Sequence, residues 1–239
     1  MFDPGAQPRI FALPPGADFA GGLVDGLLQR AEKLRPEDWA RTEVYVNTTR
    51  MQRRIRSVFD AGPARLLPRI RLITDLASDP VSLSIPPAVS PLRRRLELSK
   101  FVAKLLEQEP DLAPQTALFD LSDSLAALMD EMQGEGVSPE RIAALDVSDQ
   151  SGHWERALKF VNIIATFFGS NTEAPDLEAR QRIVIEALSL QWQSNPPKHP
   201  IIVAGSTGSR GATALFMHCL LYTSPSPRDQ RGSRMPSSA

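Results

Sequence analysis

Short apolar runs and long helical patterns alternate along the chain. Runs of strand length occur at residues 9–13, 43–47, 68–74 and 200–205, and turn or polar residues follow each of them. The run at 68–74 alternates arginine with isoleucine or leucine, which is typical of a strand with one solvated face. Helical spacing of apolar residues follows the first two runs. Strands separated by helices predict an α/β fold with a parallel sheet.

Between residues 90 and 195 the apolar residues recur only at helical spacing. We therefore predict that 1–89 form the first part of the α/β domain and that 90–195 form an all-helical insertion. Residues 196–220 are expected to return to the α/β domain. The polar stretch RPEDWART, at 35–42, is interpreted as a connection.

The last residues, 221–239, lose all periodicity and contain almost no apolar side chain. Composition alone would assign them to a disordered basic tail. The string resembles the translation of a sequencing-library adapter, so we expect a non-native tail joined to a natural sequence that is cut near Cys219–Tyr222.

The composition, with 42% apolar and 23% charged residues, is that of an ordinary globular protein. The formal net charge of -1 means that any contact with nucleic acid must be local. The single cysteine, Cys219, excludes a disulfide framework and a cysteine-ligated metal site within this chain. No stretch approaches the roughly 18 apolar residues of a membrane span. We expect a cytoplasmic protein that does not contact a membrane.

Two loops have the shape of a phosphate-binding loop. PPGADFAGG contains Gly16 and leads into a helix that Asp18 can cap. The second loop, GSTGSRGAT, follows the run at 200–205, and its candidate nucleotide-binding residues are Gly205, Ser206, Thr207, Gly208 and Ser209. A P-loop also needs a lysine for the outer phosphates, and neither loop has one. The loops are interpreted as degenerate nucleotide sites or as capped turns.

A cluster of arginines follows the run at 43–47, in the sequence TTRMQRRIRS. Thr48 or Thr49 can cap the helix that begins there, and both can bond to DNA phosphates together with Arg50. The candidate DNA-binding residues are Thr48, Thr49, Arg50, Arg53 and Arg54. A solvated helix face is the alternative interpretation.

The remaining cations and the histidines do not indicate a binding or catalytic site. The cations at 93–95, with Lys100 and Lys104, are interpreted as a solvated helix face. His153, His199 and His218 lack the spacing of metal ligands, so no metal site and no catalytic residue are assigned.

Several phrases together carry a family resemblance. They are FALPPGADF, YVNTTRMQRRIRSVF, LLPRIRLITDL, PPAVSPLRRRLELSKFV, LMDEMQGEGV, HWERALKFVNII and PPKHPIIVAGSTGS. In this order and spacing they resemble the N-terminal part of the alphaproteobacterial type of AddB, a family of double-strand break repair subunits. The resemblance covers roughly residues 8–218.

This resemblance implies a superfamily 1 helicase-like α/β region with a large helical insertion. Members of the family pair as a heterodimer with AddA, which supplies the ATP-driven motor, and the complex resects DNA ends for recombinational repair. Nuclease chemistry, with Mg²⁺ and a cysteine-bound iron–sulfur cluster, belongs to a C-terminal domain that this fragment lacks.

The resemblance also assigns the loops to helicase motif positions. PPGADF stands where the first helicase motif would be, without its lysine. Thr48, Thr49 and Arg50 stand where the family grips single-stranded DNA. Residues 205–209 stand where an active helicase holds magnesium, but they contain no carboxylate.

The sequence therefore predicts an inactive helicase-like module that helps to hold DNA and AddA. Two alternatives stay open. One is an active P-loop-type nucleotide hydrolase that uses the GSTGS turn with Arg210 for charge. The other is a helical interaction scaffold without DNA binding.

Overall fold

The computed structural model describes residues 10–32, 34–144, 151–168 and 174–222. The described chain divides into two compact units. The sheet unit contains the described residues up to Ser78, Ile185–Ser209, and those from Thr213 onward. The helical unit contains Asp79–Val184 and Arg210–Ala212.

The sheet unit is built on a parallel sheet of three strands in the order β2-β1-β3. β1 (Glu43–Val46) pairs with β2 (Arg69–Leu72) on one side and with β3 (Ile201–Ala204) on the other. The strands predicted at 43–47, 68–74 and 200–205 are confirmed, and the chain is a mixed α/β protein with far more helix than strand. The central strand is buried along its whole length.

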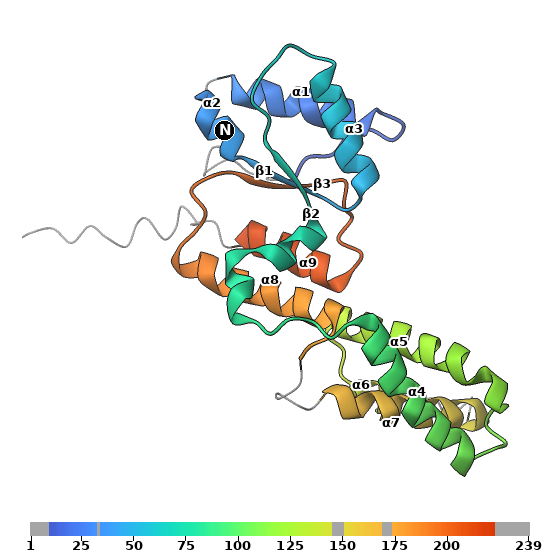
Figure 1. The fold of residues 1–239 in the computed structure, drawn as a ribbon. Coiled ribbons are helices and arrows are strands. Elements are labelled where there is room, and N and C mark those ends of the chain that lie inside the picture. Colours follow the sequence, from blue (N-terminus) through green and yellow to red (C-terminus); the bar gives the residue numbers. More distant parts are fainter. Residues whose placement is uncertain (1–9, 33, 145–150, 169–173, 223–239) are drawn as a thin grey trace, which may run out of the picture. The chain divides into compact units, whose positions relative to one another are not determined.

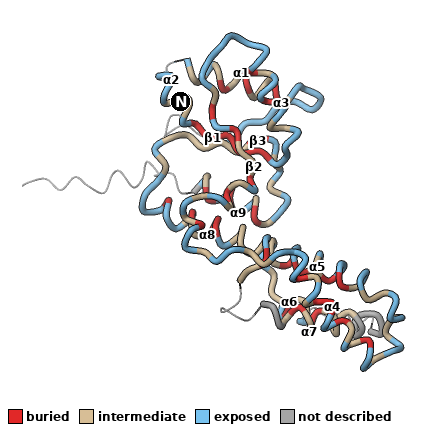
Figure 2. The backbone as a smooth tube through the Cα atoms, in the orientation of Figure 1, coloured by how far each residue is buried: buried red, intermediate tan, exposed pale blue. Residues whose placement is uncertain are grey.

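One face of the sheet packs against α1 (Phe19–Ala31) and α3 (Thr49–Asp60), which lie side by side over it (Figure 1). Val44 and Val46 point to this face because side chains alternate along a strand. They join Val24 of α1 and Ile55 of α3 in one buried cluster, drawn in red in Figure 2. This burial of apolar area is the main force that holds the two helices to the sheet.

The opposite face packs against α9 (Gly211–Tyr222) and the later part of α8 (Leu177–Ser194). Tyr45 meets Phe216 edge to face, with ring centroids 5.2 Å apart, and Trp192 lies 6.1 Å from Phe216. Such aromatic pairs add to the free energy gained by burial alone. α9 extends to Tyr222, so the first two residues of the predicted tail are helical, and 223–239 lie outside the described residues.

Two sequence-based assignments in this unit are wrong. The described part of the run at 9–13 is not a strand, and Ile10 and Phe11 are 66% and 60% exposed. It leads instead into a turn at Pro14–Ala17. The stretch interpreted as a connection contains a short helix, α2 (Pro36–Arg41), which buries Trp39 against the sheet cluster.

Helices alone make up the regular structure of the described part of the helical unit. After the 3-10 helices η1 (Ile73–Ser78, in the sheet unit) and η2 (Pro80–Ser84), the order along the chain is α4 (Pro91–Gln108), η3 (Gln115–Ala117), α5 (Leu118–Glu135), α6 (Pro139–Ala143), α7 (Ser151–Phe168) and the start of α8. Leu98 and Val102 of α4, Leu125 and Met129 of α5, and Ile164 of α7 form its core. The sequence placed the end of the insertion at 195, whereas the division falls between Val184 and Ile185, inside α8.

A buried ion pair joins distant parts of this unit. Arg94 and Asp176 are each 5% exposed, and the Arg94 Nε donates to Asp176 Oδ1 at 2.7 Å. Arg94 also donates to Glu97 at 2.7 Å, and the Gln133 amide donates to the second oxygen of Asp176 at 3.0 Å. Arg94 is therefore not part of a solvated face as the sequence suggested. Arg95, by contrast, forms a half-exposed pair with Asp123.

Replacing Asp176 by alanine is expected to destabilise the helical unit. The change leaves the Arg94 guanidinium buried with one carboxylate fewer, and breaking a buried pair in this way costs about 3 to 5 kcal/mol. Urea unfolding followed by circular dichroism measures the effect.

The matched control is Asp123→Ala, which breaks an exposed pair and should cost no more than about 1 kcal/mol. Equal losses in the two variants would contradict the structural role of the Arg94–Asp176 pair.

Candidate functional site

The carboxyl ends of the three parallel strands meet at one edge of the sheet, which we call the carboxyl edge. Asn47 follows β1, and its side-chain amide donates to the carbonyl of Gly205, which follows β3, at 3.3 Å. Gly205 also lies against Phe19 at the start of α1 and Met51 at the start of α3. The structure thus brings both candidate loops and the arginine helix to one edge, where α/β folds commonly bind ligands.

The first loop at this edge is a tight turn. The amide of Ala17 donates to the carbonyl of Pro14 at 3.2 Å, and Gly16 has a φ of 82°. Proline followed by a glycine with positive φ is the pattern of a type II turn. Open space surrounds the position that a Gly16 Cβ would occupy. Gly16 is thus required by the backbone of the turn, and no neighbouring side chain crowds it.

The second loop makes its own hydrogen bonds. Gly205 and Gly208 have φ of 68° and 66°, and the amide of Gly208 donates to the hydroxyl of Ser206 at 3.2 Å. Thr207 and Ser209 are exposed. A serine that accepts from an amide two residues later is a common turn device. The Ser206 hydroxyl and the Gly208 amide are therefore engaged with each other.

The start of α9 also has an acceptor within the protein. In the helical unit, which includes Arg210–Ala212, the amide of Gly211 donates to the Glu135 carboxylate at 2.7 Å. A Cβ on Gly211 would meet the Glu135 carboxylate at 2.6 Å, so the approach is close. A helix N-terminus attracts anions, and here the anion is a side chain of the chain itself.

The start of α3 presents donors to solvent. Thr48 is the N-cap residue, and its hydroxyl accepts from the amide of Met51 at 3.2 Å, which confirms the sequence-based cap. Thr49 and Arg50 are exposed and occupy the first turn, where a helix leaves backbone amides without an intrahelical acceptor; of these, the Met51 amide is satisfied by Thr48. The partial positive charge of the helix terminus adds to these donors.

The arginines of α3 fall into two groups. Arg54 donates to the carboxylate of Asp18 at 2.9 Å, and Arg56 reaches the carbonyl of Ile70 at 3.4 Å. Arg50 and Arg53 are exposed, and within the described part of the chain neither forms a hydrogen bond or an ion pair through its side chain. Of the candidate DNA-binding cations, two are therefore available and one is paired.

A feature that sequence reasoning missed lies at the amino edge of the sheet. Glu43 is 8% exposed, and the Tyr45 hydroxyl donates to its carboxylate at 2.7 Å. Arg69 and Arg71 of β2 lie 3.7 Å from the carboxylate, and His199, just before β3, lies 3.8 Å from it. One carboxylate of β1 thus contacts β2 and the segment that leads into β3. A lone acidic residue at the start of an apolar run was the signal available in the sequence.

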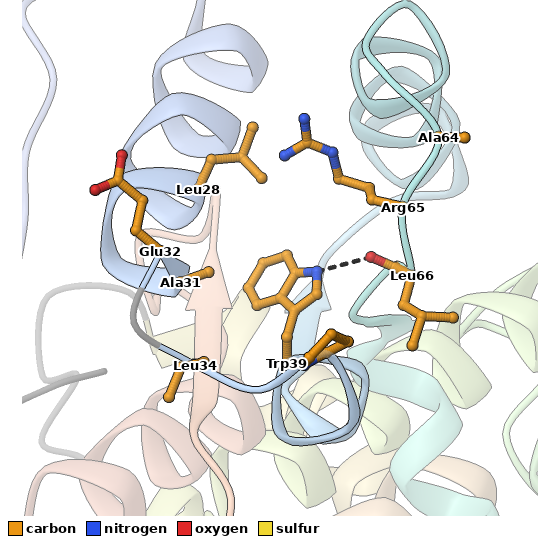
Figure 3. A pocket seen from close by; sticks show the side chains of 9 residues that line it. Leu28, Ala31, Glu32, Leu34, Trp39, Ala64, Arg65 and Leu66 are labelled. Carbon is orange, nitrogen blue, oxygen red and sulfur yellow. Dashed lines mark hydrogen bonds between the residues drawn. The ribbon is translucent and has the colours of Figure 1, made fainter.

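A hollow of about 400 Å³ also lies near the amino edge (Figure 3). The Trp39 indole donates to the carbonyl of Leu66 at 2.8 Å, and Arg65 reaches toward Leu28 above the indole. Its charged lining residues are Glu32 and Arg65, and the remainder of the lining is apolar. This lining has no nucleophile and no acid–base pair in contact, so it offers no catalytic arrangement.

Within the described ranges, no cluster of His, Cys, Asp or Glu side chains has an arrangement suited to a metal ion. Cys219, the single cysteine, is buried. The helices that the structure describes include none with the length and apolar character needed to cross a membrane. In comparisons with known proteins, neither a family model nor a curated sequence matches this chain.

Thr48 is expected to stabilise α3 whether or not it contacts a ligand. Thr48→Ala removes the acceptor for the Met51 amide and should lower the free energy of unfolding by about 1 kcal/mol. Thr49→Ala, one residue into the helix, should change it by less than about 0.5 kcal/mol. Chemical unfolding of both variants, with Thr48→Ser as the rescue, measures the difference. Equal stability of Thr48→Ala and the starting protein would contradict the capping role.

Proposed function

We propose that the sheet unit is a helicase-like module of superfamily 1 type that holds DNA without hydrolysing nucleotide. In this proposal the chain is the N-terminal part of an AddB-type subunit in the bacterial cytoplasm. Its partner is AddA, and the complex resects double-strand breaks for recombinational repair. The sequence resemblance supports the family, and the parallel sheet with a helical unit between β2 and β3 is compatible with it.

The observation that carries the proposal is the contrast between two parts of the chain. Arg50 and Arg53 extend from the start of α3 at the carboxyl edge, exposed and without an acidic partner among the described residues. The turn after β3 has its Ser206 hydroxyl engaged, and the Gly211 amide has a carboxylate acceptor. Exposed cations beside a helix N-terminus suit the phosphates of a nucleic acid backbone.

The same contrast argues against the nucleotide hydrolase. Triphosphate binding in a P-loop needs several backbone amides that point at the ligand, together with a lysine. The GSTGS turn has neither a lysine nor a carboxylate for magnesium. Arg210 is exposed, and a single guanidinium does not replace both groups.

The scaffold alternative finds support in the helical unit. Most cations that the sequence placed on a solvated face there have acidic partners: Arg93 with Glu97, Arg94 with Asp176, and Arg95 with Asp123. Paired cations have less net charge to offer a phosphate. We therefore propose that DNA contact belongs to the sheet unit and that the helical unit serves as a surface for protein contacts.

Replacing Arg50 and Arg53 together by alanine is expected to weaken DNA binding. Binding to a single-stranded oligothymidylate should start at a Kd on the order of 10⁻⁴ to 10⁻⁶ M at physiological salt. Each lost phosphate contact should reduce the slope of log K against log salt by about 0.7, so the double variant should lose about 1.4. Fluorescence anisotropy across a salt series measures both quantities.

Lys100→Ala with Lys104→Ala is the matched control, since it removes two exposed cations from α4 in the helical unit. Its slope should equal that of the unmodified chain. The opposite result is salt-dependent binding that is kept in the double arginine variant and lost in the double lysine variant. That result would assign the DNA contact to the helical unit and contradict the proposal. An absence of salt-dependent binding would favour the scaffold.

A further inference from the structure

The ion pair between Asp18 and Arg54 bridges two helices at the carboxyl edge. Asp18 is the N-cap residue of α1, and Arg54 lies on α3, one turn beyond Arg50. The Arg54 Nη2 donates to Asp18 Oδ2 at 2.9 Å. The two side chains are 56% and 57% exposed. Both partners can therefore be reached from solvent.

The exposure of the Asp18–Arg54 pair decides how readily Arg54 can exchange the Asp18 carboxylate for another anion. An ion pair in contact with water contributes about 0.2 to 1 kcal/mol, because both charges remain hydrated. A phosphate offers a guanidinium the same planar, charge-assisted hydrogen bonds as a carboxylate. Arg54 can thus leave Asp18 for a phosphate at low cost, and Asp18 can equally compete with that phosphate.

Asp18 is well suited to such competition because it stays ionised. The backbone amide of Gly21 is the largest cause that holds the pKa of the Asp18 carboxyl below its usual range; desolvation opposes it, and the guanidinium of Arg54 lowers the pKa further. Its carboxylate is therefore charged at neutral pH. Arg50 and Arg53 lie on the same helix without such a partner among the described residues, so one local acid discriminates among neighbouring arginines.

We propose that Asp18 is a built-in competitor for phosphate at Arg54. It withholds Arg54 from nucleic acid, leaves Arg50 and Arg53 as the cations that bind, and so sets the number of phosphates that the carboxyl edge holds. This inference rests on the proposed DNA contact. It assigns Asp18, which follows the PPGA turn of the first loop, a role in tuning the affinity for nucleic acid and not a role in nucleotide binding.

The test is the salt dependence of oligothymidylate binding by the whole chain and its Asp18→Asn, Arg54→Ala and doubly substituted variants. Asparagine keeps the N-cap preference of this position, so the helix is retained while the charge is removed. Asp18→Asn should steepen the slope by about 0.7, the value for one added phosphate contact on a single strand. Arg54→Ala alone should leave the slope unchanged, and the double variant should return to the original slope.

Asp60→Asn is the matched control, since it removes an exposed carboxylate from the far end of α3. It should not change the slope. If Asp18→Asn steepens the slope of log K against log salt even when Arg54 is alanine, the change comes from the overall charge of the chain. The competitor role of Asp18 is then overturned. If Arg54→Ala alone lowers the slope by about 0.7, Arg54 already binds phosphate and the proposal is likewise overturned.

These outcomes differ from a failure of the proposed function itself. In that case the unmodified chain would show no salt-dependent binding that requires Arg50 and Arg53, and both proposals would fall together. Thermal unfolding of every variant, followed by circular dichroism, confirms that the compared proteins share one fold.

Discussion

The parallel pairing of β1 with two strands distant in sequence is the constraint on which the sheet unit depends. Because all three strands run in the same direction, their carboxyl ends reach one edge, and the loops that follow must meet there. At the opposite edge, the buried carboxylate of Glu43 lies among the Tyr45 hydroxyl of its own strand, two guanidiniums of β2 and the His199 imidazole just before β3. The same register therefore explains the structural cluster at one edge and the candidate binding surface at the other.

The carboxyl edge has the arrangement of a nucleotide site but different chemistry. The first loop is a type II turn around Gly16, and the second makes a hydrogen bond within itself through Ser206. Among the described residues at this edge, the donors open to a ligand include the exposed first turn of α3 and the guanidiniums of Arg50 and Arg53. Such donors spread along a helix suit a chain of phosphates, whereas a compact triphosphate needs them gathered around one point.

Local signals in the sequence were enough to predict most elements. A cap at Thr48 or Thr49 and the apolar runs of β1, β2 and β3 are properties of short segments; the structure confirms the strands and has the cap at Thr48. The run at 9–13 failed because apolar composition does not ensure a strand partner. α2 was missed although Pro36 at its first position, followed by two acidic residues, is a helix-start signal.

The long-range ion pairs that determine which arginines are available to a ligand could not be predicted from one sequence. Arg54 and Asp18 lie 36 residues apart, and Arg94 and Asp176 lie 82 apart. Similar arginines occur beside each of them, so composition does not reveal which arginine is paired. Only the packing of α1 against α3, and of α4 against the segment before α8, selects the partner. The sequence therefore predicted where cations gather but not which of them are available.

The most direct test of the account is a competition titration. A labelled single-stranded oligonucleotide bound to the chain is challenged with ATP and magnesium at constant ionic strength, with an inert salt as the reference. We expect ATP to displace no more oligonucleotide than the reference does, because in our proposal the carboxyl edge holds a phosphate backbone and not a nucleotide. Saturable displacement by ATP that depends on magnesium and is lost in Arg210→Ala would contradict it.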